Sequence, residues 1–268
     1  MSHDTIHVYT KYTPHFGGIM AHAPHTAVWL TEPSAAAIEI AKIAGYDTIV
    51  LDVEHGPYSL HTLDWMLPLI NANDMTSIVK VTGPNREAIQ QALDLGADAV
   101  AIPHIESTDH ARTITAYAKF PPLGQRSFAG GRTSSYVGFT NAWVTDQDTN
   151  TKCYAMIEDA TAFDEIDDIL ALGTVDGVFI GPSDLSMSRG HGAYAPQGQA
   201  LDDVATIAQA ANNANKPWIL PAWSEQEKKL AVQHGAHTII ATMHFGALLS
   251  GFQQAAQQTT DIINANNN

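Results

Sequence analysis

The chain has 268 residues, with 13 lysines and arginines against 28 aspartates and glutamates, and therefore a formal net charge of −15 at pH 7. This balance argues against nucleic-acid binding, because a phosphate backbone is bound by clustered basic residues. No apolar run approaches the ~20 residues needed to cross a bilayer, and the N-terminus lacks a signal pattern of a basic stretch before an apolar one. We therefore expect a cytoplasmic protein with neither nucleic acid nor membrane as a partner. Its single cysteine, Cys153, is expected to be a core thiol.

Short apolar runs alternate with longer helical patterns along the chain, which predicts repeated βα units. Strands are expected at 17–21, 48–53, 77–81, 99–103, 153–158, 177–180, 218–220 and 238–242. Eight such units in a chain of this length favour one domain over residues 1–268, a (β/α)₈ TIM barrel with its core at about 17–251. A doubly wound open sheet is the alternative.

Several of the connecting segments carry signals for helix ends or for long loops. Helices are expected at 33–44, 86–95 and 225–234. Ser34 opens the first of these and Gly45 follows it. Two further segments, 121–151 and 181–199, are too long and too glycine-rich for simple connections, and such loops usually serve a site or an interface.

Polar residues gather where the expected strands end, which is where the active site of such a barrel lies. They are Asp52, Glu54, His55, Lys80, His104, Glu158, Gly181, Ser183 and Asp184. Charged groups placed after apolar strands are costly to bury unless they are paired or bind a metal. Glu158 and Asp184 follow neighbouring strands, so we expect their carboxylates to converge on one divalent cation. The structural alternative is that Glu158 pairs with a basic neighbour and Asp184 caps the next turn.

The remaining residues at these strand ends suit acid–base and anion-binding roles. His55, close to Asp52, is a candidate general base, with a structural histidine as the alternative. Lys80 could hold a substrate carboxylate or carbonyl, or form a Schiff base as a class I aldolase does; the carboxylate pair favours the metal. Backbone N–H groups of Gly181 and Ser183 could form a small anion pocket.

Five motifs, taken in this order, resemble the HpcH/HpaI aldolase family. They are Leu-Asp-Val-Glu-His-Gly-Pro at 51–57, the run 97–103, Phe-Pro-Pro-Leu-Gly-Gln-Arg at 120–126, Met-Ile-Glu at 156–158 and the phrase at 175–186. The similarity runs from about Gly17 to Gly251. It implies a (β/α)₈ barrel and a class II pyruvate aldolase that uses Mg²⁺, Mn²⁺ or Co²⁺. It also implies a homo-oligomer, commonly a hexamer built as a trimer of dimers that exchange the eighth helix.

The resemblance also implies roles for particular residues. Glu158 and Asp184 would hold the metal, and His55 would act in proton transfer with Asp52 orienting it. The backbone N–H groups of Gly181 and Ser183 would receive the carboxylate of pyruvate.

The sequence departs from the family pattern at several positions. Lys80 stands where the family normally has arginine, and Met156 where it usually has glutamine. The end of the expected first strand, which often carries tryptophan, reads Ile-Met-Ala-His at 19–22. Histidines that are unusual at this barrel mouth are His22, His25 and His104.

Three functions follow from these observations. The leading one is a metal-dependent aldolase that cleaves or forms 4-hydroxy-2-oxo acids through a pyruvate enolate, whose charge the metal and Lys80 would stabilise. The second is related enolate chemistry on an oxo acid, as in a decarboxylase, hydrolase or tautomerase. The third is a non-catalytic barrel that binds a metal and a small acid.

Overall fold

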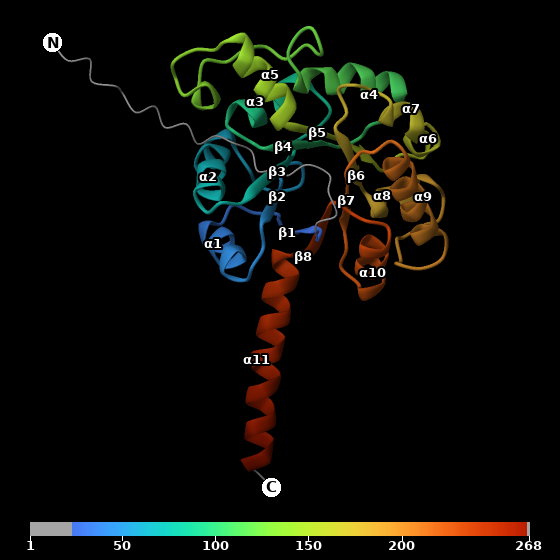
Figure 1. Ribbon diagram of the computed structural model, residues 1–268. Helices are drawn as coiled ribbons and strands as arrows, with labels where there is room; N and C mark the ends of the chain where they lie inside the picture. Colours follow the sequence, from blue (N-terminus) through green and yellow to red (C-terminus); the bar gives the residue numbers. More distant parts are fainter. Residues whose placement is uncertain (1–22, 267–268) are drawn as a thin grey trace, which may run out of the picture.

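The computed structural model describes residues 23–266, and its eight parallel strands close into a barrel (Figure 1). The strands are β1 His25–Leu30, β2 Thr48–Asp52, β3 Thr76–Lys80, β4 Ala99–Ile102, β5 Lys152–Ile157, β6 Gly177–Ile180, β7 Trp218–Pro221 and β8 Thr238–Met243. Strand β1 pairs with both β2 and β8. The predicted (β/α)₈ barrel is therefore confirmed, and the open doubly wound sheet is excluded.

Helices follow the strands and surround the barrel. They are α1 Ala35–Ile43, α2 Leu60–Ala72, α3 Arg86–Asp94, α4 Thr108–Thr115, α5 Asn141–Asn150, α6 Ala160–Asp164, α7 Ile166–Leu170, α8 Pro182–Ser188, α9 Gln199–Asn213, α10 Glu225–Gln233 and α11 His244–Asn266, with short 3-10 turns at Ala116–Ala118 and Arg132–Ser134. The Ser34 hydroxyl accepts the backbone N–H of Ala37 at the start of α1. Gly45 leaves the same helix with a φ of 92°, a conformation that glycine adopts without strain. The helix-end signals in the sequence thus act as expected.

The predicted first strand is wrong in position. The barrel begins with His25–Leu30, whereas the expected segment 17–21 lies outside the described residues. This shift has two consequences at the site. Trp29 becomes the tryptophan near the end of the first strand, and His25 moves to the N-terminal end of the barrel, where its Nδ1 lies 2.9 Å from Oδ2 of Asp47. His22 lies outside the described residues.

The core has two layers, as the alternation of side chains in a barrel requires. One set fills the barrel interior and includes Trp29, Met156 and Phe179. The larger set lies between the strands and the surrounding helices. Cys153 belongs to this larger set and is fully buried, as predicted, and burial raises the pKa of its thiol. Because the strands are mostly apolar, the polar groups of the candidate site lie at the strand ends.

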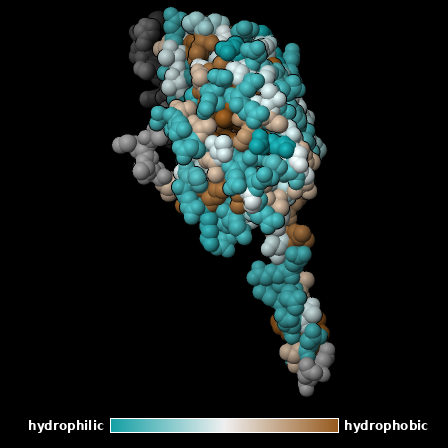
Figure 2. Space-filling model, turned by 90° about the vertical axis from the view of Figure 1, so that its right-hand side faces the viewer, coloured by the Kyte–Doolittle hydropathy of each residue, from teal (hydrophilic) through white to brown (hydrophobic). Residues whose placement is uncertain are grey.

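Helix α11 does not pack alongside the barrel but projects away from it (Figure 1). His244, its first residue, is its one buried residue. Large apolar side chains are exposed at its base and near its far end, where Figure 2 shows brown atoms on the protruding segment. They are Phe245, Leu248, Leu249, Phe252, Ile262 and Ile263. None of the described helices has the length and apolarity needed to span a membrane.

Candidate active site

Lys80 and Asp52 meet at the C-terminal ends of adjacent strands. They are the last residues of β3 and β2 and are register partners. The ammonium Nζ of Lys80 lies 3.3 Å from Asp52 Oδ1 and also contacts Oε2 of Glu54. The Lys80 side chain is only 4% exposed. A buried charge is tolerated when it is paired in this way, so the two carboxylates explain how an apolar strand can end on lysine.

Asp52 is held in place by two further contacts. Its Oδ2 accepts the indole N–H of Trp29 at 3.1 Å, and its Oδ1 accepts the backbone N–H of His55 at 3.3 Å. Lys80 also lies 5.9 Å from the centre of the Trp29 ring, within the range of a cation–π contact. Asp52 therefore orients the turn that carries His55, which fits the positioning role expected for it.

Glu54 joins the two histidines of the barrel mouth. One of its oxygens lies 2.6 Å from His104 Nε2, and the other lies 3.5 Å from His55 Nε2. Burial alone would raise the pKa of Glu54, but the hydrogen bonds and charges of Lys80 and the histidines outweigh it and lower that pKa below its usual value. Glu54 is thus held as a carboxylate. The sequence placed it at a strand end, but its link to His104 depends on the fold.

Glu158 follows β5 and is a buried carboxylate of the site. It is 5% exposed, and its Oε1 accepts the backbone N–H of His104 at 2.7 Å. His104 has a φ of 55°, which turns that N–H toward the carboxylate. Burial raises the pKa of Glu158, with a further contribution from the negative charge of Asp184. The charge of Asp184 thus acts on Glu158, and the assignment of the two carboxylates as ligands of one cation stays a prediction.

Gly181 provides space beside Glu158. A Cβ on Gly181 would lie 2.7 Å from Oε2 of Glu158. The backbone N–H of Gly181, expected to bind a substrate carboxylate, donates instead to the carbonyl oxygen of Ile157 at 3.1 Å. Ser183 and Asp184 are exposed in the first turn of α8, where backbone N–H groups have no partner within the helix. An anion pocket at this turn stays a prediction, with the N–H groups of Ser183 and Asp184 as its candidate donors, and Gly181 contributes room.

Two groups of side chains could hold a cation. Ligand atoms of Asp52, Glu54 and His55 all lie within 4.8 Å of one another. The Lys80 ammonium, however, already lies against both of these carboxylates and occupies the position of a cation between them. In the described part of the chain no basic side chain pairs with Asp184. The pair Glu158 and Asp184 therefore fits a divalent ion better, since such ions prefer carboxylate oxygens.

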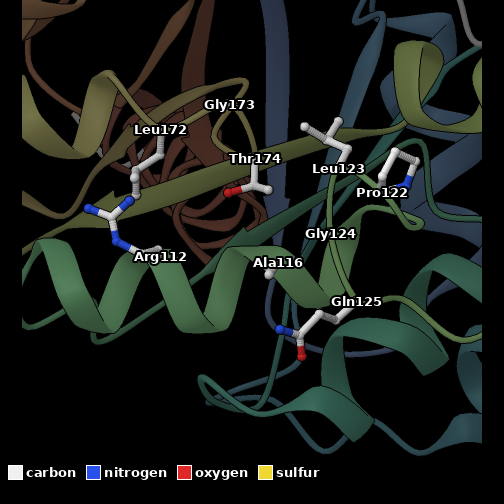
Figure 3. A pocket seen from close by; sticks show the side chains of 9 residues that line it. All are labelled: Arg112, Ala116, Pro122, Leu123, Gly124, Gln125, Leu172, Gly173 and Thr174. Atoms are coloured by element: carbon white, nitrogen blue, oxygen red, sulfur yellow. The ribbon is translucent and has the colours of Figure 1, made fainter.

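A separate cavity of about 350 Å³ lies between α4, the turn at 122–125 and the loop that precedes β6 (Figure 3). Its lining residues are Arg112, Ala116, Pro122, Leu123, Gly124, Gln125, Leu172, Gly173 and Thr174. None of the predicted site residues lines it. The candidate site is thus the cluster at the barrel mouth.

Comparisons with known proteins confirm the family resemblance found in the sequence. The model of the HpcH/HpaI aldolase/citrate lyase family matches residues 25–244. A 4-hydroxy-2-oxovalerate aldolase of Novosphingobium aromaticivorans is 36% identical over 163 residues, which are 60% of this chain and 62% of that relative. This chain thus spans less than two thirds of that relative. A 5-keto-4-deoxy-D-glucarate aldolase of Klebsiella pneumoniae is 28% identical over 91% of this chain and 93% of its own length.

A solved structure also supports membership of this family. A crystal structure of an HpcH/HpaI aldolase/citrate lyase family protein from Burkholderia cenocepacia superposes with a TM-score of 0.81 at 27% identity, covering 88% of this chain and 95% of that one. The family match begins at β1 and ends at the first residue of α11, so it includes every strand that contributes to the site. The chain therefore belongs to the HpcH/HpaI aldolase/citrate lyase family.

Proposed function

We propose that this protein is a metal-dependent carbon–carbon lyase that cleaves or forms 4-hydroxy-2-oxo acids through a pyruvate enolate. The observation that carries the proposal is the desolvated Glu158, which lies in the electrostatic range of Asp184 and beside the cluster of Lys80 and Glu54. The names of the relatives, which are aldolases of 2-oxo acids, support the same chemistry. Family membership and site geometry thus agree on the reaction class.

Glu158 and Asp184 would hold Mg²⁺, Mn²⁺ or Co²⁺, and neither is neutralised by a lysine or arginine in the described part of the chain. One oxygen of Glu158 is fixed by the His104 backbone, while the other faces the space that Gly181 leaves open. Two carboxylates leave most of the coordination shell of such an ion free for substrate oxygens and water. When bound, the ion would supply Lewis-acid stabilisation of the negative charge on the enolate oxygen.

His55 is the group we assign to proton transfer at the C4 hydroxyl. Its side chain is 65% exposed. Its Nε2 lies 3.5 Å from Oε2 of Glu54, and this contact favours one orientation of the imidazole ring. The backbone of His55 is fixed by Asp52. An exposed base on a fixed turn is accessible to a substrate hydroxyl and still has a defined position.

Lys80 serves as a fixed positive charge in this proposal. Two carboxylates neutralise its ammonium, which supports an electrostatic role over that of a free amine nucleophile. A Schiff-base mechanism would require Lys80 to leave both partners. Gly181 does not donate to the substrate in this proposal, because its N–H is already hydrogen-bonded. The N–H groups of Ser183 and Asp184 would receive the carboxylate of the oxo acid instead.

We also propose that the protein is a homo-oligomer in which α11 packs against a second copy. The six exposed apolar side chains of this helix form a surface that needs burial, and the helix makes its main contacts with its own barrel at β1 and β8. Exchange of α11 between two copies would cover both surfaces, and a trimer of such dimers would give a hexamer. Light scattering of the purified protein tests this, since a monomer would contradict it.

The test of the function is pyruvate release from 4-hydroxy-2-oxo acids with added Mg²⁺ or Mn²⁺. Glu158→Gln and Asp184→Asn should each lower kcat/KM by at least about 100-fold and weaken Mn²⁺ binding measured by calorimetry. Asp168→Asn, an exposed carboxylate on α7, is the matched control and should behave as the wild type. Unchanged turnover and unchanged Mn²⁺ binding in both site variants would contradict the proposal.

A further inference from the structure

An exposed tryptophan stands at the barrel mouth beside the candidate active site. Trp223 lies two residues beyond the end of β7, directly before Ser224, which caps α10. Its side chain is 43% exposed, and its ring packs edge-on against Trp29 with centroids 6.4 Å apart at 79°. A large apolar ring that is fixed on one side and open on the other is typical of a surface that contacts a ligand.

Trp29 connects this exposed ring to the residues assigned to chemistry. Its indole N–H donates to Asp52, and its ring lies 5.9 Å from the Lys80 ammonium. Behind it, Phe179 packs at 5.7 Å in the barrel interior. Exposure along this row rises from 0% at Phe179 to 7% at Trp29 and 43% at Trp223. The row is thus an aromatic wall that leads from the barrel core to solvent past the cluster of Lys80.

The charges around this wall disfavour an anionic group. Lys80 is bound by two carboxylates, and among residues 23–266 no arginine forms an ion pair with Asp52, Glu54 or Glu158. Glu32 follows β1 close to Trp29 and brings a negative charge to the same rim, where it lies 3.3 Å from His244. A second carboxylate on a substrate would therefore meet repulsion and find no unpaired arginine at this cluster.

We propose that Trp223 is a specificity-determining residue that selects an aldehyde with a neutral apolar or aromatic group as the partner of the oxo acid. The proposal rests on the lyase function proposed above and adds the chemical class of the second substrate. The carbonyl end of the aldehyde would face the cluster of Lys80 and His55, and its apolar remainder would cover the exposed face of Trp223. Burial of that face would give the selectivity.

The experiment is aldol addition of pyruvate by the full-length protein with Mn²⁺. Butanal and succinic semialdehyde are the paired acceptors, because they share a chain length and differ in a terminal carboxylate; benzaldehyde is the aromatic probe. We expect kcat/KM for butanal and for benzaldehyde to exceed that for succinic semialdehyde by about tenfold or more. Trp223→Ala should reduce this ratio by about tenfold, mainly through the KM of the apolar aldehydes, and Trp223→Phe should retain most of it.

The controls separate this inference from the proposed function. Val232→Ala removes another exposed apolar side chain, at the far end of α10, and should leave the ratio unchanged. Exchange of the C3 protons of pyruvate in D₂O, followed by NMR on the wild type without aldehyde, tests enolate formation alone. If exchange occurs but succinic semialdehyde is preferred, or if Trp223→Ala leaves the ratio unchanged, the inference is wrong while the lyase function stands. If exchange is absent, the proposed function fails and the inference falls with it.

Discussion

Gly181 leaves little room beside Glu158, so Gly181→Ala is a sharp test of the geometry around this carboxylate. An added Cβ would lie 2.7 Å from Glu158 Oε2 and 2.8 Å from Met156 Cε. Ordinary contacts begin at 3.4 Å, so the shortfall against the carboxylate is about 0.7 Å. The φ of Gly181 is −102°, which any residue adopts, so backbone strain does not contribute.

The cost follows from what can move. The methyl end of Met156 can rotate away, but the carboxylate of Glu158 is anchored through Oε1 to the backbone N–H of His104. Moving it stretches that 2.7 Å hydrogen bond, and leaving it in place retains the overlap. Overpacking of this kind costs about 1–3 kcal/mol, which lowers the Tm of a chain this size by roughly 2–10 °C. A displaced ligand should also weaken Mn²⁺ binding by about 10- to 100-fold.

Thermal unfolding and calorimetric titration with Mn²⁺ measure the two effects. Gly83→Ala is the matched control, because Gly83 is also buried in a loop that follows a strand, yet its added Cβ would meet the Asn85 side chain at an ordinary 3.6 Å. The control should change Tm by less than about 1 °C. If Gly181→Ala matched the control in both measurements, the close approach of the β6 loop to Glu158 would be refuted.

Two further variants test the charges. Lys80→Met leaves the carboxylates of Asp52 and Glu54 without the cation that pairs with them. We therefore expect the free energy of unfolding to fall by about 3–5 kcal/mol and kcat to fall by about 100-fold or more. A variant of wild-type stability would contradict the pairing. The hydrogen bond to Asp47 raises the pKa of His25 above its ordinary 6.5, so this pair stabilises the fold fully below about pH 6.5 and less as pH rises through the folded pKa. His25→Gln should therefore destabilise by up to about 1 kcal/mol at about pH 5.5 and by less at about pH 8.5, and a difference that grows with pH in urea unfolding would argue against the pairing.

Most of the barrel could be predicted because its strands are buried on both sides and read as apolar runs. Strands β2 to β8 lie within one residue of their expected bounds. Strand β1 was missed because two short apolar runs, at 19–21 and 27–30, precede the first helix, and both match the pattern of a strand. The helix start at Pro33–Ser34 is a signal for the position of the first strand, because that strand has to end shortly before the helix begins.

The site was less predictable than the barrel, because its contacts depend on backbone direction after the strands end. Sequence placed His104 at the mouth, but the φ of 55° that brings its N–H to Glu158 is unusual for a residue other than glycine and has no local signature. From the sequence, the N–H of Gly181 is expected to bind an anion, but in the fold it donates to the carbonyl oxygen of Ile157. That hydrogen bond depends on how the neighbouring strands pair. The sequence identifies residues of the right chemical type for the site, but only the fold shows which of them are in contact.

The net charge of −15 argues against nucleic acid as a partner, but the local arrangement decides which charges the site accepts. Lys80 offsets one of the two negative charges of Asp52 and Glu54, and the two histidines contact the second carboxylate. No lysine or arginine among the described residues forms an ion pair with Glu158 or Asp184, while the His104 Nδ1 lies 3.5 Å from Glu158 Oε1. When both are ionised, these two carboxylates carry the charge that balances one divalent ion. An anionic oxo acid can then bind at that ion, while the carboxylate-rich rim disfavours a second anionic group on its partner. In the proposed function, the separation of the Lys80 cluster from the pair Glu158 and Asp184 is thus what would allow an acidic protein to bind an acidic substrate.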